Sequence, residues 1–407
     1  MTVSVIDAGF PIDKQHSGLG ASWLRWECAR LGMPVVGPDD CDVILVTSQY
    51  PGDAGYIKSL KKRFRKPVVV GGSGCSSPYS LGLQADVVCV GDGQNMLRTL
   101  AQEGLDAAAR LPEAWVHGES RSVEVAKGFP WQCPPIQGLD GAYRVWCGRG
   151  CRKKCFFCQT GWGMEYEENP DPKVMLSQIG SLAAAGERVV YLSNDALQHS
   201  FFDLLPETHH GSYSVEYMRR RGLPPAKQVR LGIEGVSAKL RSFVGKAVSH
   251  DDLVNATVWL SRNGIAVRWF LMAGFPGETE ADWEELKDAI LRWKRLTTKG
   301  QLGLSFTAWV PMPATPMALL PCDNNHDENF KDFQRWYFGG KGRSGRLYLI
   351  KPQSHEARLK RASITMGLGP EQLKEGGDWG PNDRVNYPHK DVRNRVAASM
   401  SGRLKCC

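Results

Sequence analysis

The sequence lacks the features that define membrane, secreted and disulfide-rich proteins. No stretch of its 407 residues approaches the ~18 consecutive apolar residues that a spanning helix needs. The N-terminus, MTVSVIDAGF, shows no basic segment followed by an apolar run, so we expect no signal peptide. Twelve cysteines are too few for a disulfide scaffold of this length. We therefore expect a cytoplasmic protein with no membrane partner, in which clustered cysteines are metal ligands or catalytic groups rather than crosslinks.

Basic residues are in excess, and part of the excess is grouped. The net charge is +8. Basic blocks occur at 61–66, 219–221 and 341–361. Solvated faces that keep the protein in solution would explain them. A polyanionic partner, DNA or RNA, would explain them equally well, because lysine and arginine on one face neutralise phosphates. Both explanations stay open, since the sequence does not show whether the blocks share a face.

Residues 1–105 alternate short apolar runs with amphipathic stretches. The runs are VSVID, MPVVG, DVILVTS, KPVVVGG and ADVVCVG. They lack period-two alternation, which is typical of strands buried on both faces. Helical stretches such as GASWLRWECARLG separate them. The pattern predicts an α/β domain with a Rossmann-like, flavodoxin-type parallel sheet, which binds ligands at the carboxyl ends of its strands.

The rest of the chain divides into three segments. Residues 106–140 show few periodic apolar positions and are predicted to be a linker. Residues 141–322 again alternate strands and helices, which predicts a full or partial (β/α) barrel with its site at the carboxyl ends of the strands. Residues 323–407 lose this pattern and are predicted to form a basic C-terminal extension.

The stretch VWCGRGCRKKCFFCQTGWG, residues 145–163, concentrates four cysteines at the end of the first barrel strand. We call residues 147–163 the cysteine loop. Three of the cysteines, Cys151, Cys155 and Cys158, have the spacing C-x3-C-x2-C. A structural zinc site needs four ligands, usually in two C-x2-4-C pairs that lie far apart in the sequence. Cys147 could be the fourth ligand, but no second pair of this kind occurs outside the loop. Three thiolates suit an iron–sulfur cube with one open iron, and the spacing favours this cluster over zinc.

This spacing, with Phe157 before the last cysteine, resembles the signature of the radical S-adenosylmethionine (SAM) superfamily. Four later segments match that family in the expected order. They are YLSND (191–195), GIEGVSAKLRSFVGK (232–246), FLMAGFPGETEADW (270–283) and WVPMPATPM (309–317). The last resembles the closing-strand motif of members with an N-terminal Rossmann-like domain.

The resemblance implies a mechanism and a set of site residues. Cys151, Cys155 and Cys158 would hold a [4Fe–4S] cluster whose open iron chelates SAM. An electron from a donor of flavodoxin or ferredoxin type would yield a 5′-deoxyadenosyl radical that abstracts hydrogen from a substrate carbon, while the protein binds, orients and excludes water. The implied SAM-binding residues are Phe157, Ser193, Asn194, Glu234, Ser237, Arg241, Gly274 and Pro276, with Glu234 on the ribose.

The N-terminal domain resembles the cobalamin-binding domain of B12-dependent radical SAM enzymes and, more distantly, the N-terminal domain of methylthiotransferases. Ser48, Tyr50 and the Gly71–Gly72 pair match positions that accommodate the cobalamin tail. The D-x-H-x-x-G signature of the lower histidine ligand is missing, and DKQHSG (13–18) has the wrong spacing. Bound cobalamin and an empty Rossmann-like domain both stay open.

Two further questions concern a second cluster and the substrate. Cys41, Cys75 and Cys89 could hold an auxiliary cluster, although buried strand cysteines are more often small hydrophobic residues. The basic blocks and nearby aromatics such as Trp336 favour modification or rearrangement of a nucleic-acid base, for example a hypermodified thymidine in DNA. The alternative is a cobalamin-dependent methyltransferase for a small molecule or peptide. A cluster-bearing regulatory protein is a third hypothesis, against which the SAM motifs argue.

Overall fold

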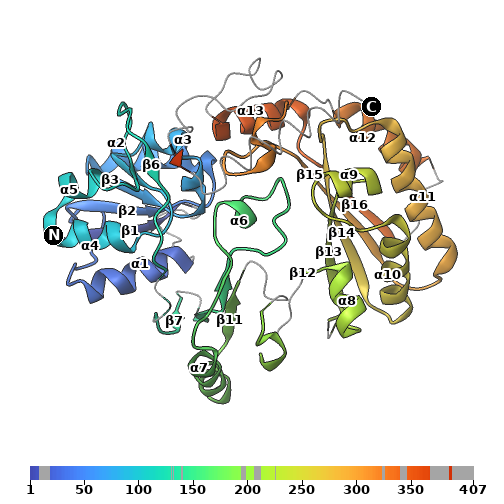
Figure 1. The fold of residues 1–407 in the computed structure, drawn as a ribbon, viewed down its shortest axis with the longest axis horizontal. Coiled ribbons are helices and arrows are strands. Elements are labelled where there is room, and N and C mark those ends of the chain that lie inside the picture. Colours follow the sequence, from blue (N-terminus) through green and yellow to red (C-terminus); the bar gives the residue numbers. More distant parts are fainter. Residues whose placement is uncertain are drawn as a thin grey trace.

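The cysteine loop lies between two α/β units, each built on its own parallel sheet (Figure 1). The computed structural model of the chain describes residues 1–8, 19–129, 131, 133–138, 141–193, 199–205, 212–224, 226–322, 326–339, 346–366 and 385–386. No helix within these ranges is long and apolar enough to cross a membrane.

The N-terminal unit is a five-stranded sheet in the order β1-β2-β3-β4-β5. Its strands are β1 (Val3–Asp7), β2 (Val43–Thr47), β3 (Val68–Gly71), β4 (Val87–Cys89) and β5 (Ala114–Trp115). The first four are parallel, and β1 and β2 are buried throughout because helices cover both faces. These helices are α1 (Leu19–Arg30), α2 (Ala54–Phe64), α3 (Pro78–Gly82), α4 (Gln94–Glu103) and α5 (Leu105–Ala109). The predicted strand MPVVG is not formed, since only Val35 makes an isolated bridge to Val3.

The expected linker, residues 106–140, contributes strands instead of a plain connection. β5 completes the N-terminal sheet by pairing antiparallel with β4. β6 (Val123–Glu124) pairs with β17 (Val385–Asn386), and β7 (Ile136–Gln137) pairs with the first barrel strand. Each strand has only two residues, which is too short to show a hydrophobic period.

The second unit begins with a small sheet that leads into the cysteine loop. β8 (Tyr143–Trp146) lies between β7 and β11 (Val189–Leu192), and α7 (Pro172–Ala184) connects β8 to β11 in parallel. Within and after the loop come β9 (Gly148–Arg149), α6 (Gln159–Trp162) and β10 (Glu167–Glu168), of which β9 and β10 pair antiparallel.

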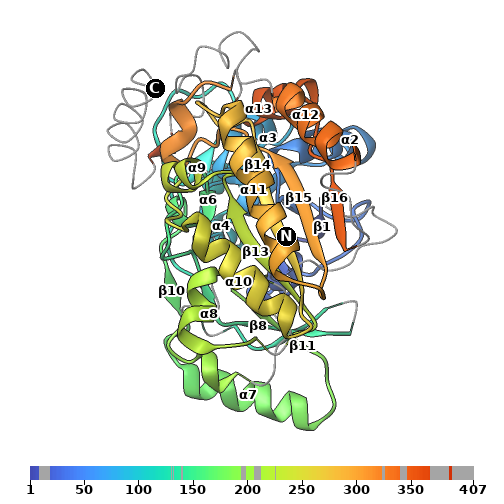
Figure 2. The same ribbon diagram turned by 90° about the vertical axis from the view of Figure 1, so that its right-hand side faces the viewer.

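The main sheet of the second unit has five parallel strands in chain order. They are β12 (Ser212–Tyr213), β13 (Gln228–Glu234), β14 (Ala266–Ala273), β15 (Leu302–Ala308) and β16 (Leu347–Ile350). Buried and half-buried residues alternate along β14, because α10 (His250–Arg262) and α11 (Glu280–Leu296) cover one face (Figure 2). The other face looks toward the cysteine loop, as in a partial barrel (Figure 1). Two shorter helices, α8 (Val215–Arg221) and α9 (Ala238–Phe243), flank β13 in the chain.

The predicted C-terminal extension is part of this unit. It supplies α12 (His326–Phe338), strand β16 and α13 (His355–Met366). β16 pairs in parallel with β15 and forms the edge of the main sheet. The sequence did not show this, because β16 has four residues and only its first is buried.

Helix α12 is attached to the main sheet by aromatic side chains. The ring of Phe333 lies 5.5 Å from that of Trp283 and 5.8 Å from that of Phe306. Phe333 is fully buried, whereas Phe338 on the same helix is 62% exposed. The ring of Phe333 therefore packs α12 against both α11 and β15.

Replacing Phe333 with alanine should lower the free energy of unfolding by about 3–5 kcal/mol, because it removes a buried ring and leaves a cavity. Urea unfolding would measure this change. The matched control Phe338→Ala should change stability by less than about 0.5 kcal/mol. Equal losses in the two variants would show that α12 is not held by this cluster.

Candidate functional site

The cysteine loop is fixed to the barrel by backbone hydrogen bonds. Phe156 donates its N–H to the carbonyl of Val244 at the end of α9, and its own carbonyl accepts from Met317. The turn is tight: Lys154 has φ of 45°, and a Cβ on Gly161 would lie 2.8 Å from the Lys154 Cα atom. Loop and barrel are thus one rigid support for the three thiols.

Cys151, Cys155 and Cys158 lie on this support as thiols rather than disulfides, with Cys155 buried and the other two half-buried. Within the described part of the chain, no three histidine, cysteine, aspartate or glutamate side chains converge on a single metal position. An iron–sulfur cube does not need such convergence, since each thiolate binds a different iron. Three thiols on one loop that do not converge on a single metal position fit the cube better than a zinc ion.

Cys147 is not part of this donor set. It is fully buried in an apolar cluster with Val145, Met175, Ile179 and Phe201, and burial raises the pKa of its thiol to about 12. A protonated thiol in apolar surroundings is a core residue rather than a zinc ligand.

Glu234 and Lys246 form an ion pair beside the thiols. Glu234 lies at an irregularity in the β13–β14 register and has φ of 68°. Lys246 Nζ donates to Glu234 Oε1 over 2.9 Å and to the carbonyl of Gly232 over 2.7 Å. Burial alone would lower the pKa of Lys246, but Glu234 and the thiols of Cys155 and Cys158 outweigh it and hold the pKa above its usual value. Lys246 is therefore a permanent cation at this site, and Glu234 still has a second oxygen for a ligand.

The turn after β14 lies against the same loop. The Phe157 ring is 6.2 Å from Phe275, which in turn is 6.0 Å from Trp309. Gly274 has φ of 84°, and the following Phe275 and Pro276 are buried. The structure thus brings together Phe157, Gly274 and Pro276, three of the predicted SAM-binding positions.

Two buried ionisable side chains, Glu278 and Arg358, hold the backbone of this turn. Glu278 accepts hydrogen bonds from the Gly274 N–H (2.9 Å) and the Trp283 indole (3.0 Å), and burial raises its pKa to about 7. The fully buried Arg358 of α13 donates to the carbonyls of Gly274 (2.9 Å) and Cys322 (3.2 Å). A Cβ on Gly274 would lie 1.9 Å from the guanidinium, so only glycine fits there.

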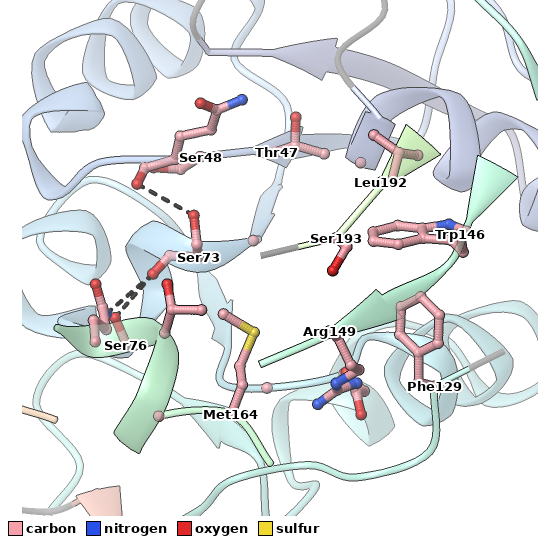
Figure 3. Close-up of a pocket in the computed structure, with 18 of the residues that line it drawn as sticks. Thr47, Ser48, Ser73, Ser76, Phe129, Trp146, Arg149, Met164, Leu192 and Ser193 are labelled. Atoms are coloured by element: carbon pink, nitrogen blue, oxygen red, sulfur yellow. Dashed lines mark hydrogen bonds and ion pairs between the residues drawn. The ribbon is translucent and has the colours of Figure 1, made fainter. Parts of the chain in front are cut away.

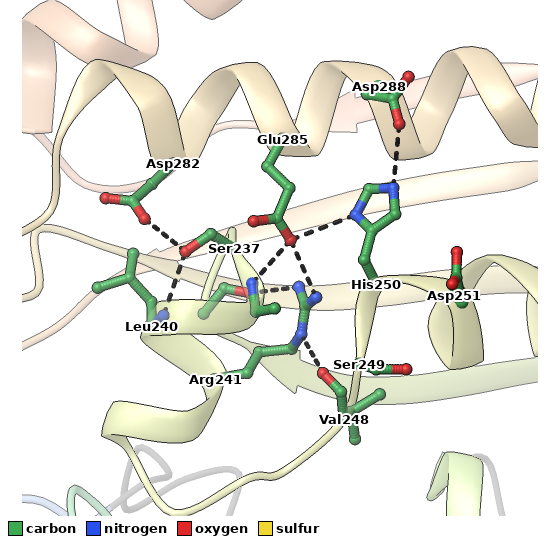
Figure 4. A network of polar contacts seen from close by, with 12 residues as sticks. Ser237, Leu240, Arg241, Val248, Ser249, His250, Asp251, Asp282, Glu285 and Asp288 are labelled. Carbon is green, nitrogen blue, oxygen red and sulfur yellow. Dashed lines mark hydrogen bonds and ion pairs between the residues drawn. The ribbon is translucent and has the colours of Figure 1, made fainter.

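Ser237 and Arg241 are committed to contacts inside the protein (Figure 4). Ser237 caps α9 and donates to Asp282 over 2.5 Å. Arg241 is 1% exposed and donates to the carbonyl of Val248 (2.8 Å) and to Glu285 (3.3 Å). These bonds connect α9 to α11 and fix the backbone just after Glu234. Contact of either side chain with SAM stays a prediction.

Ser193 lies elsewhere, in a cavity of about 520 Å³ between the N-terminal sheet and the cysteine loop (Figure 3). Thr47, Ser48, Gly72, Ser73 and Gly91 line it at the ends of the N-terminal strands. Trp146, Gly148, Arg149, Gln159 and Met164 line it from the cysteine loop and its flanks. Asn194, predicted beside Ser193, lies outside the described residues.

The three cysteines considered for an auxiliary cluster are core residues. Cys41 and Cys75 belong to one apolar cluster of the N-terminal unit and Cys89 to another. Burial is the main cause that raises the pKa of all three thiols. They form no metal-binding group within the described ranges.

Lys246, Glu278, Arg358 and Arg149 were not identified from the sequence. Lys246 follows Glu234 within a quoted motif, so its opposite charge was an available signal. Arg358 was counted in a basic block, and nothing local distinguishes a buried arginine from an exposed one.

Arg358→Ala should weaken SAM binding roughly tenfold or more, because the turn loses two charge-assisted hydrogen bonds of about 1.5–3 kcal/mol each. Iron content should stay normal, since the cysteine loop is anchored elsewhere. Equilibrium binding of SAM to the reconstituted protein would measure the effect, with the exposed neighbour Arg361→Ala as control. Unchanged affinity would show that α13 does not support the turn.

Glu278 should make stability depend on pH. The folded state keeps its proton up to about pH 7, whereas the unfolded chain loses it near the ordinary value of 4.5. The contribution of Glu278 to the free energy of unfolding is complete below pH 4.5 and is lost as the pH rises to 7. Relative to wild type, Glu278→Gln should gain up to about 3 kcal/mol of unfolding free energy across this range. If wild type and Glu278→Gln show parallel pH profiles of unfolding free energy, this expectation is wrong. The control is Glu280→Gln, an exposed position whose profile should follow that of wild type.

Curated relatives match most of the chain. An uncharacterized protein of Methanocaldococcus jannaschii is 23% identical over 334 residues, which are 72% of each protein. A tRNA-2-methylthio-N(6)-dimethylallyladenosine synthase of Neisseria gonorrhoeae is 23% identical over 347 residues, or 73% of this chain and 74% of the synthase.

Solved structures share the fold. The methyltransferase TsrM of Kitasatospora setae, with cobalamin and a [4Fe–4S] cluster bound, superposes with a TM-score of 0.56 at 15% identity and covers 99% of this chain and 100% of its own. The radical enzyme OxsB with aqua-cobalamin bound superposes with a TM-score of 0.50 at 14% identity, and the match covers 71% of this chain and 52% of OxsB. At these identities the likeness shows the arrangement of an N-terminal Rossmann-like sheet followed by a radical SAM domain.

The sequence model described as "Radical SAM superfamily" matches residues 147–290. That range contains the three cysteines, Glu234 with Lys246, and the 274–278 turn. The cofactors that follow are a [4Fe–4S] cluster and SAM. The fold, the thiol donor set and this match together identify the chain as a radical SAM enzyme.

Proposed function

We propose that this radical SAM enzyme is a cobalamin-dependent methyltransferase whose substrate is a small molecule or peptide. The observation that supports it best is the cavity between the carboxyl ends of the N-terminal strands and the cysteine loop. Parallel α/β sheets bind ligands at that edge. The fold neighbours TsrM and OxsB are described with cobalamin bound.

The N-terminal wall of the cavity is built from close-packed backbone. Gly72 has φ of 106°, and a Cβ there would lie 2.4 Å from the carbonyl oxygen of Ser48. A Cβ on Gly74 would lie 2.6 Å from the Ser48 hydroxyl. The loops after β2 and β3 therefore present a smooth surface of backbone and small side chains, which suits a large, flat ligand.

The opposite wall carries polar atoms without partners. Trp146 Nε1 and Arg149 Nε are buried and have no hydrogen-bond partner among the described residues. Arg149 is 8% exposed, and its Nη1 pairs with Asp92 of the N-terminal unit over 2.5 Å. Since buried polar groups are normally satisfied, these donors support a ligand with acceptor atoms in the cavity. The residues present therefore fit a bound cofactor.

The described lining would hold a bound cobalamin without a histidine ligand. No histidine is among the described residues that border the cavity. The DKQHSG segment, residues 13–18, lies outside the described part of the chain. The lining otherwise offers hydroxyl, amide and aromatic groups, such as Thr47, Gln49 and Phe129.

In the proposed function, each group at the site has a separate role that follows from its position. When bound, the cluster supplies the electron that cleaves SAM, and cobalamin supplies a methyl carrier. Cys151, Cys155 and Cys158 would hold the cluster, Glu234 the ribose, and Lys246 a negative charge of SAM beside it. A flavodoxin- or ferredoxin-type protein would donate the electron. The N-terminal unit and the cysteine loop enclose the cavity, which excludes water from the reacting groups.

The nucleic-acid hypothesis has less support. α2, with part of the first basic block, and α8, with the second, lie on opposite sides of the molecule (Figure 1). In the third block, Arg358 is buried, and Arg346 donates to the carbonyls of Thr297 and Lys299. The side chains of 219–221 and residues 340–345 lie outside the described part, so a polynucleotide partner stays a prediction. The similarity to a tRNA-2-methylthio-N(6)-dimethylallyladenosine synthase is a reason to test tRNA binding.

Reconstitution with iron, sulfide and cobalamin tests the proposal. We expect a stoichiometric corrin spectrum after gel filtration, and S-adenosylhomocysteine beside 5′-deoxyadenosine on turnover. Gly72→Ala should lose the corrin and keep the iron. The control Gly118→Ala also has positive φ, but nothing lies within 4 Å of its added Cβ. Cys155→Ala should lose the iron.

Two results would overturn the methyltransferase. One is a protein that binds no corrin at saturating cobalamin. The other is tight binding of tRNA or DNA with a log–log salt slope near −4 to −5, the value expected if roughly five phosphates are neutralised. That slope would restore base modification as the leading function.

A further inference from the structure

The side chain of Lys246 places a positive charge beside the cysteine loop. It is 20% exposed, and its partner Glu234 is 16% exposed, so water screens neither charge fully. Gly245, the residue before Lys246, has φ of 79°, and a Cβ there would lie 3.7 Å from the Cα atom of Cys155. The backbone that carries Lys246 therefore lies against the backbone of a predicted cluster ligand.

Three hydrogen bonds hold Lys246 in this place. Its backbone N–H donates to the carbonyl of Arg241 over 2.8 Å. Its Nζ donates to the carbonyl of Gly232 over 2.7 Å and to Glu234 Oε1 over 2.9 Å. The Gly232 carbonyl belongs to β13, so one of the two bonds of the ammonium group does not depend on Glu234.

Lys246 is the charge with the largest influence on the Cys155 thiol. Burial is the main cause that raises the pKa of this thiol, and Lys246 is the largest cause that acts to lower it. Glu234 acts to raise the pKa, but it has less influence than Lys246, and Lys153 acts to lower the pKa still more weakly. Lys153 also pairs with Glu216 over 3.2 Å. Glu234 thus does not cancel the effect of Lys246 on the thiol, although the two side chains are paired.

A cation at this position favours the reduced form of a bound cluster. Each thiolate ligand brings a negative charge, and the electron that SAM cleavage requires adds one more. The attraction of a nearby cation grows with that added charge, and in a partly buried site it is weakened less than in water. Net charge is one of the factors that set the reduction potential of an iron–sulfur cluster.

We propose that Lys246 raises the reduction potential of the cluster and so makes its reduction by the donor protein more favourable. The step moves one electron from a reduced flavodoxin- or ferredoxin-type donor to the oxidised cluster. The donor is oxidised, the cluster is reduced, and Lys246 keeps its proton, so no covalent bond forms or breaks. This role is separate from contact with SAM, because it acts before SAM binds. The inference rests on the radical SAM assignment and not on methyl transfer or cobalamin.

A redox titration of the holoenzyme without SAM tests this role. The protein is reconstituted with iron and sulfide, and the reduced cluster is followed by electron paramagnetic resonance at controlled potential. In Lys246→Met, the ratio of reduced to oxidised cluster at a given potential should fall about tenfold, a shift of about 59 mV for one electron. Lys246→Arg keeps the charge and should stay within about twofold of wild type. Lys227→Met, at an exposed position just before β13, is the matched control and should leave the ratio unchanged.

Glu234→Gln should shift the ratio in the opposite direction. It removes the negative charge and leaves the cation, so the reduced fraction at a given potential should rise. A purely structural effect of the two substitutions has no reason to change sign between them. Shifts in the same direction, or a Lys246→Met titration that coincides with that of wild type, would overturn the proposal.

The double variant Lys246→Met with Glu234→Gln is the second test, because Lys246→Met alone leaves a buried carboxylate without its cation. Lys246 has the larger influence on Cys155, so the ratio should still fall, but less than in Lys246→Met. A ratio equal to or above that of wild type would overturn the proposal.

SAM affinity and corrin content, measured on the same proteins, separate this inference from the other roles of the site. Weaker SAM binding in Lys246→Met with an unchanged potential would overturn the proposal and leave Lys246 as a SAM-binding residue. The predicted potential shift in a protein that binds no corrin would refute the methyltransferase and leave this inference intact. Bound corrin without the shift would do the opposite.

Discussion

The fixed position of the cysteine loop between two sheets is the constraint on which the rest of the structure depends. Its backbone is tied to the barrel through Phe156, which bonds to Val244 and Met317. On the other side, Arg149 pairs with Asp92, and Gln159 donates to the carbonyl of Ser73 over 3.3 Å. Because one loop carries both sets of contacts, a cofactor on its thiols and a ligand in the cavity have a defined separation.

Buried charged side chains hold the loops of this site through hydrogen bonds and ion pairs. Arg241 joins α9 to α11, Arg358 ties α13 to Gly274, and Lys246 binds Glu234 and the Gly232 carbonyl. Each is paired or hydrogen-bonded, since an unpaired buried cation would cost several kcal/mol. These residues hold the loops after β13 and β14, so the groups that we predict to bind SAM would not need to reorganise during the reaction.

The two walls of the cavity have different chemistry. The N-terminal wall is smooth backbone and hydroxyls, and the wall from the second unit carries Trp146, Arg149 and the Ser193–His199 pair. Under the proposed function, a cofactor on the first wall and a substrate on the second would meet in the middle of the cavity. The division suggests why a Rossmann-like domain precedes the barrel, because it provides a surface that the barrel does not have.

The sequence by itself predicted three cluster ligands and determined the order of the main strands. Cys151, Cys155 and Cys158 lie within eight residues, so their spacing predicts thiols that act together, and long apolar runs such as β2 and β14 show their burial directly. Strands of two to four residues, β5 to β7 and β16, carry no such period and became visible only through their pairing. Tertiary structure alone decided that Arg358 is buried, that Lys246 meets the thiols, and that His199 stands between Ser193 and Tyr166. These contacts join residues from separate elements, and their energies depend on burial and approach that no local pattern records.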